Sequence, residues 1–199
     1  MKQNSYHHGN LKEELIQAGL KIINEEGEEH LSLRKAATLC QVSHAAPKSH
    51  FNSKEEFVEE IKQYVTAEFT KSMEDVILKN EDKNKLIQEF GLAYIKYFMK
   101  HPDSYLFVTS QKDIEIKVSK DLIYDSNYAP FQIFQKNASE VLLKKGFAKQ
   151  SIPHRIIALW AIVNGLTGIY IMKGFHYEGD FMEIAKSILN EDVEDNVCY

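Results

Sequence analysis

Helix-forming segments that end at identifiable stop signals follow one another along this chain. The first begins after Asn10, a suitable N-cap, and repeats apolar residues such as Leu15 and Ala18 at near-helical spacing up to Gly27. Helix breakers are scarce, with four prolines and nine glycines in 199 residues, and no segment shows a clear strand pattern. The sequence therefore predicts an all-α fold.

The expected helices lie on either side of a polar break at residues 80–84, Asn-Glu-Asp-Lys-Asn. Apolar spacing and caps predict helices at residues 10–27, 33–40, in a short segment ending near 51, and at 53–79, 85–100, 103–110, 130–145, 152–173 and 181–189. Residues 111–127 carry no clear pattern. This organisation predicts three regions, namely a three-helix helix-turn-helix domain over residues 1–52, a long connecting fourth helix over 53–80, and a helical domain over 81–199.

Residues 32–51 have the pattern of a helix-turn-helix motif. Ser32 caps a helix with a continuous apolar stripe, and a tight turn at residues 41–43 leads into a short second helix. At 100° per residue, Pro47 and Phe51 share one side of that second helix, so both should face the core. Proline is tolerated there because the N–H groups of a first helical turn lack helical partners anyway.

The other side of the second helix carries small and basic residues that suit DNA. Small side chains let the backbone approach base edges, whereas lysine, arginine and hydroxyl groups can contact phosphates. Residues 30–54 contain four basic residues and no acidic one, although the whole chain has a net charge of −5. This excess is also typical of an ordinary solvated face, so charge and periodicity leave both interpretations open. The candidate DNA contacts are Ser32, Arg34, Ser43, His44, Ala45, Ala46, Lys48, Ser49, His50 and Lys54.

The stretch SLRKAATLCQVSHAAPKSHFNSKEEF, residues 32–57, resembles the N-terminal signature of TetR-family transcriptional regulators. The motifs YHHGNL at residues 6–11 and HAAP at 44–47 resemble the branch with a WHG-type C-terminal domain. Trp160-Ala-Ile-Val-Asn-Gly is similar to the motif of that domain, with Asn164 where histidine is usual. The resemblance implies a homodimeric regulator, more often a repressor, that binds a palindromic DNA operator and responds to a small-molecule effector.

Two residues of the motif depart from the family pattern. Gln41 occupies a turn position where the family usually has glycine, and a left-handed turn residue other than glycine costs some strain. Lys48 stands where the family usually has a phosphate-contacting tyrosine. Lysine keeps a phosphate partner but loses the aromatic packing, so the operator preference of relatives does not transfer to this chain.

Aromatic residues are concentrated in the second half, where residues 90–147 hold eleven of the 22 in the chain. Most such residues are ordinarily core, but tyrosine hydroxyls need partners when buried, which also suits a mostly apolar pocket with a few polar groups. The resemblance implies that the effector binds in this half. The candidate effector contacts are Tyr94, Phe98, Tyr105, Phe107, Tyr128, Phe131, Trp160 and Asn164.

The segment 152–173 is apolar on almost every side, which requires burial all round. In the family the last two long helices form a four-helix dimer interface, and residues 152–173 and 178–190 fit that role. A dimer also follows from the DNA side, because one such motif makes too few contacts for tight specific binding.

Other classes of function have weaker support. The sequence contains no zinc-protease, carboxylate–histidine or nucleophile-elbow motif, so we expect no enzyme, no cofactor and no metal site. The longest apolar run contains Asn164 and is too short to span a bilayer, and no secretion signal precedes it, so we expect a cytoplasmic protein without a membrane anchor. The alternative is a helical adaptor of the same fold that no longer binds an operator.

Overall fold

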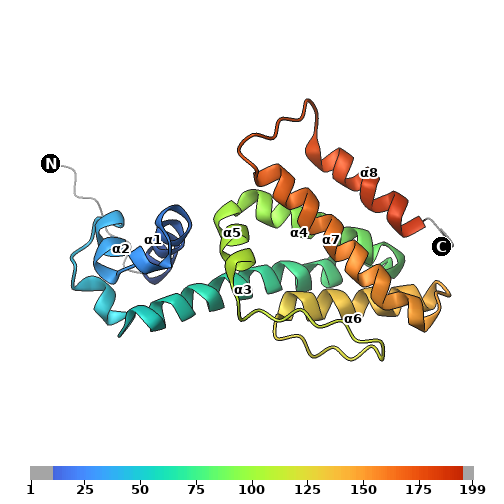
Figure 1. The fold of residues 1–199 in the computed structure, drawn as a ribbon, viewed down its shortest axis with the longest axis horizontal. Helices are drawn as coiled ribbons and strands as arrows, with labels where there is room; N and C mark the ends of the chain where they lie inside the picture. The colour runs from blue at the N-terminus through green and yellow to red at the C-terminus, as the bar shows by residue number, and fades with distance from the viewer. Residues whose placement is uncertain (1–10, 195–199) are drawn as a thin grey trace. The chain divides into compact units, whose positions relative to one another are not determined.

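A computed structural model describes the chain over residues 11–194. The described residues form α-helices joined by turns and short 3-10 helices, which confirms the predicted all-α fold (Figure 1). The predicted cap Asn10, residues 6–9 of the N-terminal motif, and Cys198 lie outside the described residues. The helices are α1 (Leu11–Glu26), α2 (Leu33–Leu39), α3 (Lys54–Lys79), α4 (Leu86–Lys100), α5 (Pro102–Ser110), α6 (Ala129–Lys144), α7 (Ile152–Ile171) and α8 (Phe181–Glu194).

The chain packs as two compact units. The first contains the residues up to Val65 together with Asp103–Gln111, and the second contains Thr66–Pro102 and the residues from Lys112 onward. Helix α3 begins in the first unit and ends in the second. The division therefore falls inside α3, between the positions 52 and 80 that bound the connecting helix in the sequence.

The first unit has a core formed by α1, α2, the beginning of α3 and α5. Leu15, Ala36, Phe57, Ile61 and Phe107 are fully buried in it. Polar contacts tie α1 to α3 at its rim, since the Tyr64 hydroxyl donates to Glu13 at 2.7 Å and Lys12 pairs with Glu60 at 2.7 Å.

The helices of the motif begin at the residues that the sequence indicates. The Ser32 hydroxyl accepts a hydrogen bond from the Lys35 N–H at 3.2 Å, as an N-cap does. At the start of α3, the Ser53 hydroxyl accepts from the Glu56 N–H at 3.1 Å, and the Glu56 carboxylate accepts from the Asn52 N–H at 2.6 Å. This reciprocal pair satisfies two N–H groups that the helix itself cannot.

The short second helix of the motif is a single 3-10 turn, Ala46–Ser49. Its hydrogen bonds span three residues, from the Ala46 N–H to the Ser43 carbonyl at 3.0 Å and from the Lys48 N–H to the Ala45 carbonyl at 3.1 Å. Pro47 has no N–H to continue an α-helical ladder, which favours the tighter turn. The helix ends before Phe51, as predicted.

In the second unit α4 packs against α6, α7 and α8 (Figure 1). Aromatic rings fill the space between the helices, with Trp160 of α7 in contact with Tyr94 of α4 and with Phe131 and Phe134 of α6. Phe69 of α3 completes the cluster, with its ring centroid 5.3 Å from that of Tyr94. Ring-to-ring packing of this kind holds the four helices together beyond the burial of area alone.

The expectation that helix 152–173 is buried all round is wrong for the single chain. One face of α7 is buried, but Ile157, Ile169 and Met172 are 54%, 42% and 61% exposed. One chain covers only one side of an apolar helix, which leaves the other side open. The expectation that this apolar segment is too short to span a bilayer is wrong by length, since the helix Lys149–Ile171 is long and apolar enough to cross a membrane. A single such helix is weak evidence for a membrane span, because the core helix of a soluble protein passes the same test.

Candidate DNA interface and effector site

The motif in the first unit has one buried and one exposed side. Pro47 is buried and Phe51 is 1% exposed, with its ring centroid 4.5 Å from that of Phe57, which confirms the predicted orientation. Ala45, Lys48 and Ser49 are exposed. The packing of Pro47 and Phe51 therefore directs these three residues to solvent, where a DNA groove could receive them.

Several of the predicted DNA contacts already have partners within the unit. The Lys54 ammonium donates to the Glu29 carbonyl at 3.1 Å, and the Ser49 hydroxyl donates to the Ala46 carbonyl at 2.7 Å. His44 Nε2 lies 3.2 Å from the Thr38 hydroxyl, which fixes its ring against α2. These contacts orient part of the exposed side within the unit itself.

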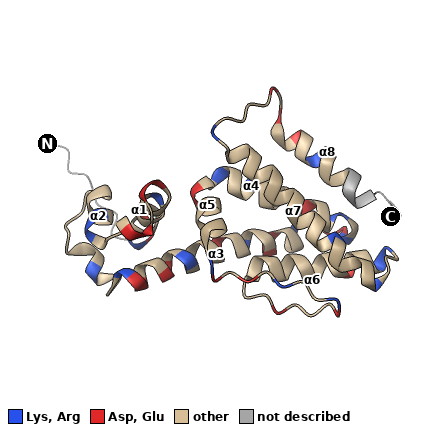
Figure 2. Ribbon diagram, viewed as in Figure 1, with Lys and Arg blue, Asp and Glu red and all other residues tan. Residues whose placement is uncertain are grey.

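Charge is divided within the first unit. Acidic residues gather at the end of α1 and basic residues lie on α2, whereas the first turn of α3 carries Lys54 together with Glu55 and Glu56 (Figure 2). The Lys35 ammonium forms an ion pair with Glu26. The exposed side chains of Arg34 and Lys48 have no ion pair with any of the described residues. These two cations are thus available for phosphates, while Lys35 is neutralised.

The turn of the motif has the strain that its sequence indicates. Gln41 has a φ of 55°, in the left-handed region that glycine adopts without cost. It directly follows α2, where the Gln41 N–H donates to the Thr38 carbonyl at 3.1 Å. The side chain is exposed, so the cost is one of backbone conformation rather than of packing.

Five of the eight predicted effector contacts form one connected group in the second unit. The Tyr94 hydroxyl donates to the Asn164 side-chain oxygen at 2.8 Å, and the Asn164 amide donates to the Trp160 carbonyl at 2.8 Å. Phe98 packs against Tyr94 at 4.9 Å between centroids, and Phe131 packs against Trp160 at 4.8 Å. Asn164 is therefore a satisfied amide within an aromatic cluster.

The other three predicted contacts have different surroundings. Tyr128 is 3% exposed in the second unit, and burial raises the pKa of its hydroxyl far above the usual range, with the neighbouring Tyr97 adding to the shift. Phe107 and Tyr105 belong to the first unit, where Phe107 is part of the core and partial burial raises the pKa of Tyr105. The structure therefore does not gather the eight residues into one unit.

Helix α6 carries a row of buried polar atoms without hydrogen-bond partners. The Tyr128 hydroxyl, Gln135 Oε1 and Ser139 Oγ are all buried and unpartnered, and Gln135 and Ser139 are at most 1% exposed. Gln135 and Ser139 lie four residues apart on one face of α6, and Tyr128 directly precedes the helix. A buried polar atom without a partner costs about 1–3 kcal/mol, so these groups lower the stability of the second unit.

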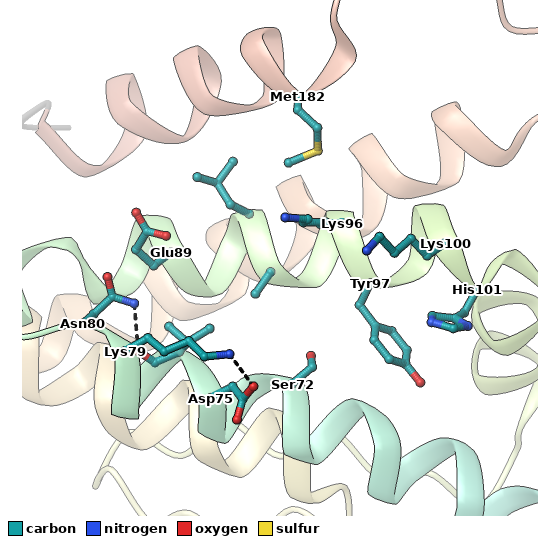
Figure 3. A pocket seen from close by; sticks show the side chains of 13 residues that line it. Ser72, Asp75, Lys79, Asn80, Glu89, Lys96, Tyr97, Lys100, His101 and Met182 are labelled. Carbon is teal, nitrogen blue, oxygen red and sulfur yellow. Dashed lines mark hydrogen bonds and ion pairs between the residues drawn. The ribbon is translucent and has the colours of Figure 1, made fainter.

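A cavity of about 720 Å³ opens between the second half of α3, α4 and the start of α8. None of the eight predicted residues lines it, although the neighbouring Tyr97 does. Figure 3 shows Glu89 and Asn80 at one end of the cavity and Lys96, Lys100 and His101 at the other. The lining residues are Ser72, Asp75, Val76, Lys79, Asn80, Glu89, Leu92, Ala93, Lys96, Tyr97, Lys100, His101 and Met182.

This cavity was missed because its polar residues look like a solvated helix face. Lys96 and Lys100 recur at the spacing of an exposed helical stripe, and only the packing of α3 and α8 alongside turns that stripe into a wall. In the sequence, two lysines one turn apart with no acidic residue between them could have indicated an anion-binding site on this helix. Across residues 11–190, whose side chains the structure describes, no group of three or more metal-ligating side chains is gathered closely enough to hold an ion.

No protein-family model matches the sequence, and none of the curated proteins matches it either. Several solved structures are similar to this chain. A protein of unknown function from Rhodococcus sp. RHA1 is similar with a TM-score of 0.69 at 17% identity, covering 96% of this chain and 97% of its own. The TetR-family regulator PfmR from Thermus thermophilus is similar with a TM-score of 0.66 at 18% identity, covering 90% of this chain and 94% of its own.

A third similar structure is the transcriptional regulator FadR from Bacillus subtilis in complex with stearoyl-CoA. Its TM-score is 0.68 at 13% identity, and the match covers 92% of this chain and 97% of that one. Identities this low compare folds rather than functional residues. The chain therefore has the fold of TetR-family transcriptional regulators, in agreement with the resemblance of its N-terminal residues.

Proposed function

We propose that the protein is a ligand-responsive transcriptional regulator that binds a palindromic operator as a homodimer and acts as a repressor. The observation that carries the proposal is the two-sided motif of the first unit, with Pro47 and Phe51 buried and Ala45, Lys48 and Ser49 exposed. A short turn of small residues can approach base edges, while Lys48 and Arg34 contact the flanking phosphates. The TetR-type fold supports this assignment.

The homodimer uses the open face of α7 together with α8. Ile157, Ile169 and Met172 leave large apolar surfaces in water on the single chain. A second copy that packs the same face against its own would bury them, and a symmetric dimer presents two motifs to a palindromic site. From Ile157 to Ile171 helix α7 contains no acidic or basic residue, which suits a core-like, obligate interface.

The effector binds in the second unit. The cavity between α3, α4 and α8 supplies the mixed apolar and polar lining that small-molecule sites have, and the aromatic cluster around Trp160 packs the helices of the same unit. The stearoyl-CoA complex of FadR supports small-molecule binding by a protein of this fold. Because an effector acts only through a difference in affinity, it must bind the DNA-free and DNA-bound conformations unequally.

A mobility-shift titration with the DNA upstream of the protein's own gene tests the proposal. We expect retardation that weakens steeply as salt is added, and we expect Lys48→Ala to lower the slope of log K against log salt by about 2, because the dimer carries two copies of this lysine. Lys71→Ala, an exposed lysine of the second unit, is the matched control and should leave the slope unchanged. Absence of retardation at low salt would instead favour an adaptor of the same fold.

A further inference from the structure

The cavity between α3, α4 and α8 holds two lysines that no carboxylate neutralises among the residues described here. Lys96 and Lys100 lie one turn apart on α4 and both line the cavity (Figure 3). The third lysine, Lys79, forms an ion pair with Asp75 at 2.6 Å and is therefore compensated. Like charges one turn apart on a helix repel each other, so an anion placed between the two ammonium groups would be stabilising.

The remaining carboxylate of the cavity is at its other end. Glu89 precedes Lys96 by seven residues on α4, which places it roughly 10 Å away along the helix axis. Figure 3 shows it beside Asn80, while His101 lies next to Lys100 at the basic end. The cavity therefore has one acidic and one basic end, and no carboxylate among its lining residues pairs with the lysines of the basic end.

Apolar groups line the middle of the cavity. Val76 of α3, Leu92 and Ala93 of α4 and Met182 of α8 contribute side chains there. One polar atom is embedded among them, since the Ser72 hydroxyl is buried and has no hydrogen-bond partner. A partly apolar cavity with a basic end suits a molecule that has both an apolar body and an anionic group.

We propose that this cavity binds an amphipathic organic anion. Its charged group, a carboxylate, sulfonate or phosphate ester, lies between the ammonium groups of Lys96 and Lys100, and its apolar body packs against Val76, Leu92 and Met182. A volume of about 720 Å³ is within the range of small-molecule sites, so a molecule of the size of a medium-chain fatty acid fits.

The site also suggests how such a ligand would act, and this consequence alone rests on the proposed function. Ser72, Asp75 and Lys79 belong to the end of α3, and the beginning of the same helix contributes Phe57 and Ile61 to the core of the first unit. A ligand that orders or shifts the end of α3 acts on the helix that both units share. The amphipathic anion is then the effector class of the regulator.

A site-resolved titration tests the binding itself without DNA. The methyl group of Met182, labelled with carbon-13 and assigned with Met182→Leu, reports on the cavity by NMR. We expect octanoate to shift this resonance in a saturable way, and octan-1-ol and octyltrimethylammonium to bind at least about 10-fold more weakly because they lack the anionic group. Each methylene added to the carboxylate should tighten binding by about 3-fold.

Variants identify the basic end. Lys96→Ala combined with Lys100→Ala should weaken octanoate by about 10-fold or more, whereas Lys144→Ala with Lys145→Ala removes the same charge from the exposed end of α6 and should have no effect. If the double alanine variant does not fold, the double variant Lys96→Gln, Lys100→Gln is measured in its place. Equal binding of octanoate and octan-1-ol, or a Met182 resonance that octanoate leaves unmoved up to about 10 mM, overturns the proposal.

Discussion

The two units treat their polar groups in opposite ways. In the first, polar side chains around the motif lie at the surface and are held by nearby partners, as Lys54 is by the Glu29 carbonyl and Tyr64 by Glu13. In the second, Tyr128, Gln135 and Ser139 are buried with unpartnered polar atoms, and two lysines line a cavity without a carboxylate partner among the described residues. Within the part of the chain that the structure describes, the buried side-chain polar atoms without a partner all belong to the second unit.

Under the proposed function, this difference corresponds to two kinds of recognition. DNA is read at a surface, so the first unit gains by presenting a fixed arrangement of exposed groups on a well-packed core. A small molecule binds inside the second unit, where a ligand can supply partners to the unpartnered polar atoms. Without the ligand, these atoms lower the stability of the unit. The comparison can be tested by changing one side chain at a time in each unit.

The largest effect is expected where the exposed motif depends on the core of the first unit. Phe51→Ala removes a ring that is 1% exposed and stacks on Phe57, and it should lower the free energy of unfolding by about 3–5 kcal/mol. Urea denaturation measures the change. Leu78→Ala, at a side chain 81% exposed, is the control and should change stability by less than about 0.5 kcal/mol. A small loss at Phe51 would show that the core does not hold the motif.

A matched pair of tyrosines compares the two units directly. Tyr128→Phe removes a buried hydroxyl without a partner and should stabilise the protein by about 1–2 kcal/mol. Tyr64→Phe removes a hydroxyl that donates to Glu13 at 2.7 Å and should destabilise it by about 1 kcal/mol. Thermal and urea unfolding of both variants give the signs. Loss of stability in Tyr128→Phe would mean that this hydroxyl has a partner in solution, and the contrast between the units would fail.

The smallest effect concerns the turn of the motif. Gln41→Gly allows the φ of 55° without a side-chain clash and should raise the free energy of unfolding by about 0.5–1 kcal/mol. Gly146→Ala is the reverse test in the second unit, since its φ is 87° with open space around an added methyl group, and it should destabilise by about 1 kcal/mol. A destabilised Gln41→Gly would show that the glutamine side chain contributes more than its backbone costs.

Much of the first unit could be predicted from the sequence because its signals are local. The caps at Ser32 and Ser53, the burial of Pro47 and Phe51, and the left-handed turn at Gln41 each follow from residues a few positions apart. The 3-10 geometry of the second helix was not predicted, because it depends on the balance between Pro47 and a very short segment. The WHG-type branch remains a prediction.

The second unit was harder to predict because its sites arise from helices distant in sequence. The pairing of Tyr94 with Asn164 joins residues 70 positions apart, and aromatic content alone indicates the cluster without its partners. Phe107 is aromatic like the residues of that cluster, but it belongs to the core of the first unit. The cavity at Lys96 and Lys100 requires α3 and α8 to pack beside α4, which no periodicity of α4 reveals.

The central claim is that the first unit binds DNA and that a ligand in the second unit controls this binding. The direct measurement is the affinity of the full chain for its operator DNA with and without octanoate, in the wild type and in the Lys96→Ala, Lys100→Ala variant. We predict that octanoate changes the wild-type affinity by about 10-fold or more and leaves that of the variant unchanged, with both proteins binding DNA equally in its absence. An octanoate effect of equal size in both proteins, or no effect in the wild type, would contradict the account.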